Sequence, residues 1–438
     1  MTEPISGFSK LTKEEKIDWV TSNYTENKEQ SIKILQTYWN QNYNTQQLHD
    51  EFIENTLTNL YLPLGIAPNF LINNKLYAIP MAIEESSVIA AASKAAKFWL
   101  NRGGFRTEVL GTEKVGQVHF LFNGDFEKLS SFFTFLKPRL INESASLTTS
   151  MKKRGGGISD IVLKNKTGEL KNYFQLHATF QTKDAMGANF INSCLEQFAA
   201  TLKKEAAAYD GFTEEEKNVE VIMSILSNYV PNCTVRAQVS CPVEELRLGA
   251  DLSPQHTAEK IIQAIKIAQI EPYRAVTHNK GVMNGIDAVV LATGNDFRAV
   301  EAGVHAYACR NGQYTSLTHA EIENGIFTFW IELPLALGTV GGLTNLHPLV
   351  KLNLEILQNP SAEDLMQIIA VAGLAQNFAA VSSLVTTGIQ KGHMKMHLLN
   401  ILNQLGASTI EKAKLVTYFK TNTVTHHEVE LQLNTLRK

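Results

Sequence analysis

Four charged side chains in this chain of 438 residues have neighbours that suggest chemistry, namely Glu85, Lys280, Asp296 and His393. In the stretch HNKGVMNGIDAVVLATGND, residues 278–296, a lysine stands near the start and an aspartate closes a run of small apolar residues. Such charges can form structural ion pairs or take part in chemistry, and the stretch alone does not choose between these roles. Sixteen positions separate the two, so one continuous helix cannot join them, whereas a turn between them could.

Structural roles explain each of these charges as well. Glu85 lies just ahead of an apolar helical pattern, where an acid ordinarily interacts only with the helix dipole. His393 lies in KGHMKMH between a glycine and further lysines, which is typical of an exposed, mobile loop. Periodicity alone therefore does not assign catalysis to any of them.

Three further tracts could bind phosphate or a ligand. Asp184 in QTKDAMGANF stands where a strand pattern gives way to a helix, and a helix N-terminus with small residues can hold a pyrophosphate. A simple N-cap role for Asp184 explains the same pattern, and the tract is not GxGxxG. Lys152, Lys153 and Arg154 precede three glycines and could grip a phosphate monoester or form a solvated turn. GTVGG, residues 338–342, suits either ligand approach or close packing.

Composition places the chain among ordinary soluble globular proteins of two or three domains. It is 44% hydrophobic and 19% charged, and a net charge of −3 gives no electrostatic reason to expect nucleic acid. Its four cysteines form no CxxC pair, and we expect no metal. Together with the absence of a signal-peptide pattern in MTEPISGFSKLTKEEK, they predict a cytoplasmic location.

One segment is long enough to cross a membrane, because residues 365–390 contain no charge. Glutamine, asparagine, serine and threonine interrupt it, and much of the remainder is alanine. We therefore predict a helix buried against other helices, and no membrane.

The order of the predicted elements indicates an α+β fold with an inserted ferredoxin-like domain. The first third reads as helical, with a capping box at Thr12–Glu15 and a packed helix over 84–100. From residue 112 the patterns are strand 116–122, helix 125–137, strands 158–164 and 173–182, and helix 185–208. This is the order of a split βαβ domain. A second capping box, Thr213 with Glu216, marks its end.

Further helix and strand patterns follow this inserted domain. They are a strand at 233–241, a helix opening at Ser253-Pro254, and a hairpin over 319–334 that turns at Asn324-Gly325. The last fifty residues form a small helical unit or flap. The predicted domains are a large domain in two parts, 1–111 and 221–388, a small dinucleotide-binding domain, 112–220, and a C-terminal flap, 389–438.

Several tracts together resemble 3-hydroxy-3-methylglutaryl-CoA (HMG-CoA) reductase, in the soluble bacterial form called class II. These tracts are ENTLTNLYLPLGIAPNF (54–70), PMAIEESSVIAAAS (80–93), DAMGAN (184–189), RAVTHNKGVMNGIDAVVLATGND (274–296), GTVGG (338–342) and GHM (392–394). The resemblance implies reduction of a thioester to the alcohol mevalonate, with two hydrides from nicotinamide and release of coenzyme A. It also implies a homodimer with the active site at the subunit interface.

The resemblance assigns roles to the four charges. Lys280 stabilises the oxyanion that hydride attack creates, and Asp296 keeps Lys280 protonated and in position. Glu85 donates a proton in the second reduction, together with Lys280. His393 protonates the leaving thiolate.

It also assigns binding residues. Ser87 and Arg274 would hold the hydroxymethylglutaryl group and its carboxylate, with Asn284 near the reacting carbonyl. Asp184, Met186, Gly187 and Asn189 match the nicotinamide-dinucleotide segment of the small domain.

Two positions depart from the family pattern. Thr58 replaces a glycine in ENTLT. Where a strictly NAD-using relative would carry an acid for the ribose, seven positions before the triple glycine, this chain has Thr148. With Lys152, Lys153 and Arg154 nearby, we predict a preference for NADPH, with NADH as a possible substitute. The alternatives are another acyl-CoA-dependent oxidoreductase, an enzyme that oxidises mevalonate, a catalytically inactive relative, and an RNA-binding module.

Overall fold

The structure is a computed structural model, and it describes residues 4–249, 252–386, 388, 398–419 and 422–438. The chain divides into two compact units, Met1–Pro63 and Leu64–Lys438. Helices and sheets are both present in the second unit, as the α+β prediction requires.

The first unit is helical. Its elements are the short 3₁₀ helix η1 (Phe8–Lys10), α1 (Lys13–Tyr24), α2 (Lys28–Thr37) and α3 (Tyr43–Asp50). The predicted capping box is confirmed, because the Thr12 hydroxyl accepts from Glu15 N and the Glu15 carboxylate accepts from Thr12 N.

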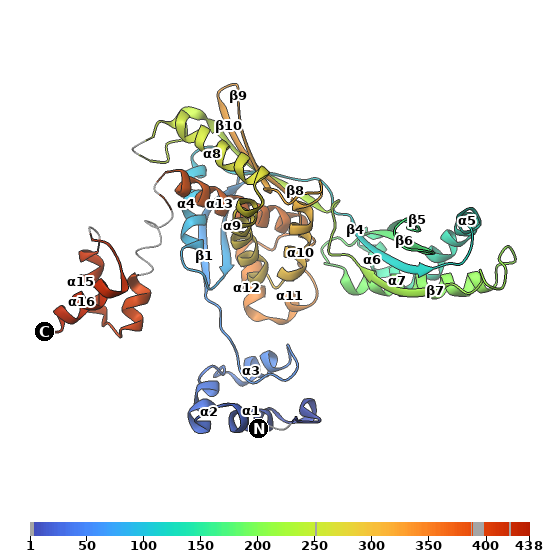
Figure 1. The fold of residues 1–438 in the computed structure, drawn as a ribbon, viewed down its shortest axis with the longest axis horizontal. Coiled ribbons are helices and arrows are strands. Elements are labelled where there is room, and N and C mark those ends of the chain that lie inside the picture. Colours follow the sequence, from blue (N-terminus) through green and yellow to red (C-terminus); the bar gives the residue numbers. More distant parts are fainter. Residues whose placement is uncertain (1–3, 250–251, 387, 389–397, 420–421) are drawn as a thin grey trace. The chain divides into compact units, whose positions relative to one another are not determined.

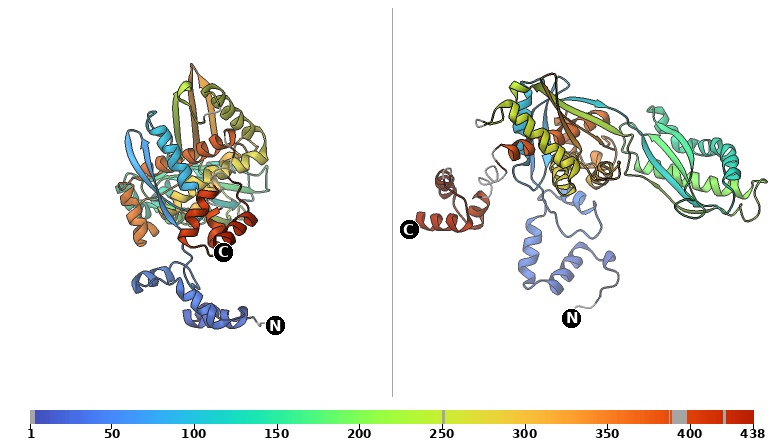
Figure 2. Two further views of the ribbon diagram at one scale, coloured as in Figure 1. Left: turned by 90° about the vertical axis from the view of Figure 1, so that its left-hand side faces the viewer. Right: turned by 45° about the horizontal axis from the view of Figure 1, so that its top comes forward.

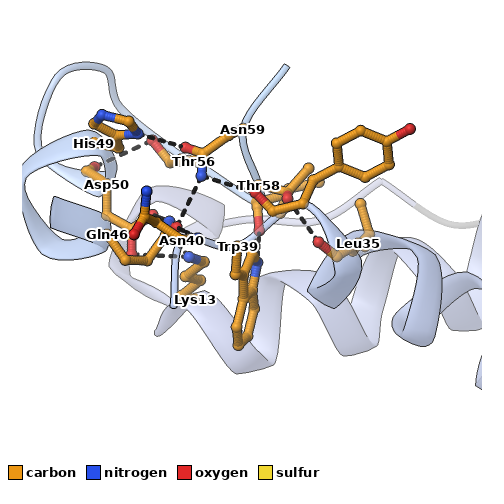
Figure 3. Close-up of polar contacts among 12 residues, drawn as sticks. Lys13, Leu35, Trp39, Asn40, Gln46, His49, Asp50, Thr56, Thr58 and Asn59 are labelled. Carbon is orange, nitrogen blue, oxygen red and sulfur yellow. Dashed lines mark hydrogen bonds and ion pairs between the residues drawn. The ribbon is translucent and has the colours of Figure 1, made fainter. Parts of the chain in front are cut away.

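Polar contacts fix the chain that leaves this unit (Figure 3). The Lys13 ammonium lies 2.7 Å from Asp50 Oδ1 and above the Trp39 ring, whose indole N–H donates to Leu57 O. The Thr58 hydroxyl donates to Leu35 O at 2.7 Å. Thr58 is not among the described non-glycine residues with positive φ, so a threonine fits here without left-handed strain. The departure from the family glycine thus adds a hydrogen bond to the end of α2.

The second unit contains three sheets, whose strand orders are β1-β2, β3-β8-β10-β9 and β5-β6-β4-β7. The strands are β1 (Leu64–Ile72), β2 (Lys75–Ala82), β3 (Arg106–Val109), β4 (Lys114–Leu121), β5 (Gly157–Asn165), β6 (Tyr173–Gln181), β7 (Glu220–Leu226), β8 (Thr234–Pro242), β9 (Thr318–Glu323) and β10 (Ile326–Pro334).

Its helices mostly cover these sheets. They are α4 (Val88–Leu100), α5 (Phe126–Glu143), α6 (Ala145–Lys153), α7 (Ala188–Ala207), η2 (Val243–Glu245), α8 (Pro254–Ile270), α9 (Pro272–Ala292), α10 (Phe297–Ala308), α11 (Leu343–Leu346), α12 (Pro348–Ile356), α13 (Ala362–Val385), α15 (Thr409–Tyr418) and α16 (His426–Leu436). The last helices share a separate small core, which includes Leu402, Leu415 and Leu433.

The four-stranded sheet β5-β6-β4-β7 has the ferredoxin-like arrangement (Figure 1). All its pairings are antiparallel, and side chains from α5 and α7 share one core with β4 and β6. Helix α5 continues past Pro138 to Glu143, beyond its predicted end. The edge strand β7 begins at Glu220, where the sequence prediction ends this domain. We propose that the domain boundary lies after Leu226 instead.

The Thr213–Glu216 capping bonds form, although the segment is a turn and not a longer helix. The β9–β10 hairpin projects from its sheet (Figure 2). Both residues of its predicted turn have positive φ, 52° at Asn324 and 78° at Gly325, as a type I′ turn requires.

The prediction of a helical first third is wrong for residues 64–82, which form the antiparallel pair β1–β2. A register shift between Ala67 and Phe70 interrupts the alternation, and Asn69 has a φ of 70°. This bulge hides the period-two pattern from the sequence.

Helix α13 is the centre of the large core, where it packs against α9, α4 and β8. It is the one helix in the described ranges that is long and apolar enough to cross a membrane, and 78% of that apolar window is buried. The prediction of a buried core helix for this segment is confirmed.

Candidate active site

A lysine, a glutamate and an asparagine meet between α9 and the β2–α4 connection. Lys280 Nζ lies 2.6 Å from Glu85 Oε2, and Asn284 Nδ2 donates to the same oxygen at 3.4 Å. Lys280 and Asn284 are four residues apart on α9, so they share one face of the helix. The Lys280 side chain is 59% exposed and that of Glu85 37%. An accessible ammonium is thus held in an ion pair with a carboxylate.

The connection that carries Glu85 has an unusual backbone. Ser87 is the N-cap of α4 with a φ of 75°, and its side chain makes no capping hydrogen bond. A left-handed conformation at a non-glycine residue is uncommon and often accompanies function. The strained turn places Glu85 and Ser87 on the same short loop, which agrees with a shared substrate site.

A buried polar network fixes the rotation of α9. His278 Nε2 lies 2.6 Å from Thr318 Oγ1, and Thr318 donates to Asn377 Oδ1 on α13. The Asn377 amide donates in turn to the His278 carbonyl. Burial lowers the pKa of His278 to about 3, so its imidazole is neutral. Because the network sets which side of α9 faces the core, it also directs Lys280 outward.

Two glycines allow α9 and α13 to approach closely. A Cβ at Gly285 would lie 2.4 Å from the Ala372 carbonyl oxygen, and one at Gly373 would lie 2.8 Å from Ile286 Cγ1. Side chains other than hydrogen would force the helices apart. The small residues of the 278–296 tract therefore serve packing, while Lys280 on the exposed side of α9 remains accessible.

The predicted contact between Lys280 and Asp296 is wrong within a single chain. Asp296 is the N-cap of α10, where Oδ1 accepts from Arg298 N and Ala299 N, and it forms an ion pair with Arg298 Nε at 3.0 Å. These bonds, chiefly the one from Arg298, lower the pKa of Asp296. Helix α9 continues for twelve residues beyond Lys280, a rise of about 18 Å. In this chain the partner of Lys280 is Glu85.

Arg274 and His393 are the remaining predicted residues of this site. Arg274 lies in the first turn of α9, half-buried, with a guanidinium nitrogen 3.5 Å from His278 Nδ1. Burial lowers its pKa. Among the described residues, Arg274 forms no hydrogen bond or ion pair with Glu85 or Lys280. His393 lies outside the described residues.

A second site surrounds a cavity of about 640 Å³ between the β6–α7 connection and the start of α13. Its polar lining includes Thr112, Lys114, Arg154, Lys183, Asp184 and Glu363. Two arginine or lysine groups at its edge, Arg154 and Lys183, suit an anionic ligand. This arrangement fits the phosphates of a dinucleotide.

The predicted cofactor segment forms the wall of this cavity. Asp184 does not cap α7, because its Oδ1 accepts from Ala362 N at the start of α13, 2.8 Å away. Gly187 is the N-cap of α7 with a φ of 91°, and a Cβ there would lie 2.4 Å from Thr182 Cγ2. Met186 lines the adjoining apolar pocket, and Asn189 is exposed in the first turn of α7.

The basic tract is only partly at the cavity. Arg154 lines it, whereas Lys152 and Lys153 are exposed in the last turn of α6. Thr148 is fully buried, and its hydroxyl donates to Ala145 O. The structure therefore does not bring Thr148 to the cavity, and a role for Thr148 beside the ribose stays a prediction.

Comparison with known proteins identifies one enzyme family. A sequence model of the hydroxymethylglutaryl-coenzyme A reductase family matches residues 12–398. A 3-hydroxy-3-methylglutaryl-coenzyme A reductase from Archaeoglobus fulgidus is 36% identical over 419 residues, which cover 95% of this chain and 90% of that protein. This chain belongs to the HMG-CoA reductase family.

Other members of the HMG-CoA reductase family match at similar levels. A probable HMG-CoA reductase from Borreliella burgdorferi is 35% identical over 423 residues, 94% of this chain and 93% of that protein. A solved HMG-CoA reductase from Streptococcus pneumoniae has a TM-score of 0.73 at 34% identity, covering 99% of this chain and all of that one. A class II structure from the same organism, bound to NADPH in open conformations, has a TM-score of 0.72 at 34% identity and covers 87% and 100%.

Sequence reasoning missed three charged groups near these sites. Lys183 and Lys114 line the cavity, but neither belongs to the tracts that carry the family resemblance. Asp287 on α9 is half-buried, and burial together with Glu301 raises its pKa to about 8. The sequence around Lys183 does not reveal that this residue has a positive φ. Lys114 could have been noticed as a lysine directly ahead of the strand pattern that begins at residue 116.

Proposed function

We propose that this chain reduces HMG-CoA to mevalonate and free coenzyme A, with consumption of two NADPH and two protons. The observation that carries the proposal is the contact of Lys280 Nζ with Glu85 Oε2 at 2.6 Å, with Asn284 on the same face of α9, in a chain of this family. Four electrons are needed to convert a thioester to a primary alcohol, which accounts for two equivalents of reductant.

The residues of α9 and the β2–α4 connection have separate tasks. NADPH, when bound, would supply the hydride that reduces the substrate carbonyl. The Lys280 ammonium stabilises negative charge on the carbonyl oxygen as it develops. Glu85, which shares a hydrogen bond with that ammonium, holds the proton that the oxygen receives in the second reduction. His393 protonates the departing thiolate, by its match to the family motif.

We place the dinucleotide in the 640 Å³ cavity beside α7, and the hydroxymethylglutaryl group beside Lys280. Arg154 and Lys183 provide the positive charge that a 2′-phosphate would select, which supports NADPH over NADH. Ser87 and Arg274 remain proposed contacts of the substrate.

The functional protein is a homodimer in this proposal. A Lys280–Asp296 contact needs Asp296 of a second copy, because Asp296 of the same chain caps α10 and pairs with Arg298. Apolar side chains at the end of α8 and the start of α9 are also exposed in the single chain, namely Ile270, Tyr273 and Val276. Exposed large apolar side chains ahead of Lys280 in the sequence support a subunit interface there. We also propose a cytoplasmic location, because the four cysteines are free thiols, as is usual in a reducing compartment.

The test is a stoichiometric assay on the purified full-length protein. HMG-CoA is added with NADPH or NADH, nicotinamide absorbance is followed at 340 nm by the usual method, and thiol release is titrated in parallel. We expect about two NADPH oxidised per thiol released, from the electron count above. Oxidation of one NADPH per thiol would indicate an aldehyde-forming acyl-CoA reductase instead, and no oxidation with either dinucleotide would refute the proposal.

A further inference from the structure

Lys114 on β4 is a buried ammonium whose acceptors are neutral. Lys114 is only 5% exposed. Nζ donates to Thr182 Oγ1 at 2.6 Å, to Ala185 O at 2.9 Å and to Leu337 O at 3.4 Å. Within the described ranges, no carboxylate lies among its hydrogen-bond partners. A buried charge without a counter-ion destabilises the fold, so packing alone does not account for a lysine here.

The three acceptors belong to two different segments. Thr182 and Ala185 are in the β6–α7 connection, which continues to Met186 and Gly187. Leu337 follows β10 and leads into GTVGG. One ammonium therefore hydrogen-bonds to both segments at once.

These two segments also contact each other directly. Thr339 N donates to Asp184 O at 2.8 Å, and Ala185 forms a parallel bridge with Val340. A Cβ at Gly338 would lie 2.4 Å from Met186 N, so the backbones are in close contact there. Lys114 lies beside this junction, and movement of its amine would displace the loop of residues 182–187.

The same junction forms one wall of the proposed dinucleotide cavity. Lys114, Asp184, Leu337 and Val340 all line it. Any change in the bonds from Lys114 therefore alters the shape of the wall that meets the cofactor, even though the ammonium itself is nearly covered.

We propose that Lys114 is a positioning residue of the dinucleotide site, and that its protonated amine holds the 182–187 loop against the segment that leads into GTVGG. The inference rests on the proposed function, because it assigns the cavity to the nicotinamide dinucleotide. Neutral lysine donates fewer and weaker hydrogen bonds than the ammonium. Loss of the proton therefore loosens the loop.

Burial lowers the pKa of Lys114 to about 8, which places this change in an accessible range of pH. The other titratable groups that line the cavity are Arg154 from α6, Lys183 and Asp184 from the β6–α7 connection, Cys233 from the end of the segment before β8, and Glu363 from α13. Burial raises the pKa of Cys233 to about 11, so that thiol stays neutral through the same range. The affinity for dinucleotide should fall as pH rises through about 8.

The experiment measures the Kd for NADPH by nicotinamide fluorescence from pH 6.5 to pH 9.5, on the full-length protein and on the variants Lys114→Met and Lys183→Met. Thermal melting and steady-state kinetics are recorded on the same samples. Methionine keeps the length of the lysine stem but lacks the amine, and Lys183→Met controls for loss of any positive charge at the cavity. The pH profile of the unsubstituted protein tests the inference without any substitution.

We expect Lys114→Met to raise Kd about tenfold at pH 7, with kcat at saturating NADPH changed by less than about threefold. The unsubstituted protein should lose affinity above about pH 8 and approach the variant, whose Kd should not show this step. Lys183→Met should keep the step. The Tm of Lys114→Met should be equal to or above that of the unsubstituted protein, because a buried charge has been removed.

Two results would overturn the inference alone: an unchanged Kd for Lys114→Met at pH 7, or a lower Tm with kcat and Kd impaired together, which a purely structural role predicts. If the unsubstituted protein binds neither NADPH nor NADH at any pH, the proposed function itself is refuted, and the assignment of Lys114 falls with it.

Discussion

The most demanding prediction concerns sites shared between two copies of the chain. Lys280→Ala removes the ammonium, and Asp296→Asn removes the acid while keeping an efficient N-cap for α10. Lys280 is more than half exposed, so its loss should affect the fold little. Each variant dimer alone should therefore fold and be nearly inactive.

The geometry decides what a hybrid of the two variants can do. Lys280 and the end of α9 are about 18 Å apart along the helix axis. Asp296 forms an ion pair with Arg298 of its own chain. If each site combines Lys280 of one copy with Asp296 of the other, a hybrid dimer has one site with both changes and one site with neither. Purified hybrids should show about half the activity of the unsubstituted dimer, and an unseparated mixture about a quarter.

The assay uses co-expression with two different affinity tags, sequential purification of the hybrid, and NADPH oxidation with HMG-CoA. Chromatography with light scattering confirms that the hybrid is a dimer. Hybrid activity no higher than that of either variant dimer would show that Lys280 and Asp296 act within one chain, which would refute the shared site.

Three other substitutions test separate parts of the account. Gly285→Ala should lower the free energy of unfolding in urea by about 1–3 kcal/mol, because its Cβ would lie 2.4 Å from Ala372 O. The control Gly281→Ala, whose Cβ would have its nearest neighbour at 3.9 Å, should be neutral or stabilising. Equal effects of the two substitutions would contradict the close crossing of α9 and α13. The pKa of Asp287 is raised to about 8, so the contribution of its protonated form to stability is lost as pH rises from about 4 to about 8. Asp287→Asn should therefore flatten the decline of Tm over that range of pH. Identical profiles of Tm against pH for the variant and the unsubstituted protein would argue against a buried proton. Arg154→Glu should raise the KM for NADPH at least about tenfold while changing the KM for NADH by less than about threefold. The control Lys153→Glu should raise the KM for NADPH less. An equal rise in KM for both dinucleotides, or a much higher kcat/KM with NADH in the unsubstituted protein, would contradict the NADPH preference.

Local signals explain why much of the fold was predictable. The Thr12 capping box and the Asn324-Gly325 turn depend on neighbouring residues only, and both form as the sequence predicts. The β1–β2 pair was missed because the bulge at Ala67–Phe70 breaks the alternation that marks a strand.

The contacts within the sites depend on distant residues, which explains the errors there. Glu85 and Lys280 are 195 residues apart, and Asp184 binds the start of α13 at a separation of 178 residues. Spacing along the chain carries no information about such pairs. The expected Lys280–Asp296 contact came from the family resemblance, whereas within one chain Asp296 caps α10 and pairs with Arg298.

The central claim is that the Lys280 ammonium stabilises the oxygen that becomes negative when the thioester accepts hydride. Its most direct test is the kcat and KM of Lys280→Ala with HMG-CoA and NADPH, beside Lys266→Ala on the exposed side of α8 as a control. We predict that kcat falls by about 100-fold to 1,000-fold, with the KM for HMG-CoA changed by only a few-fold, since the interaction is strongest in the transition state. A kcat within about threefold of that of the Lys266→Ala control would contradict the claim.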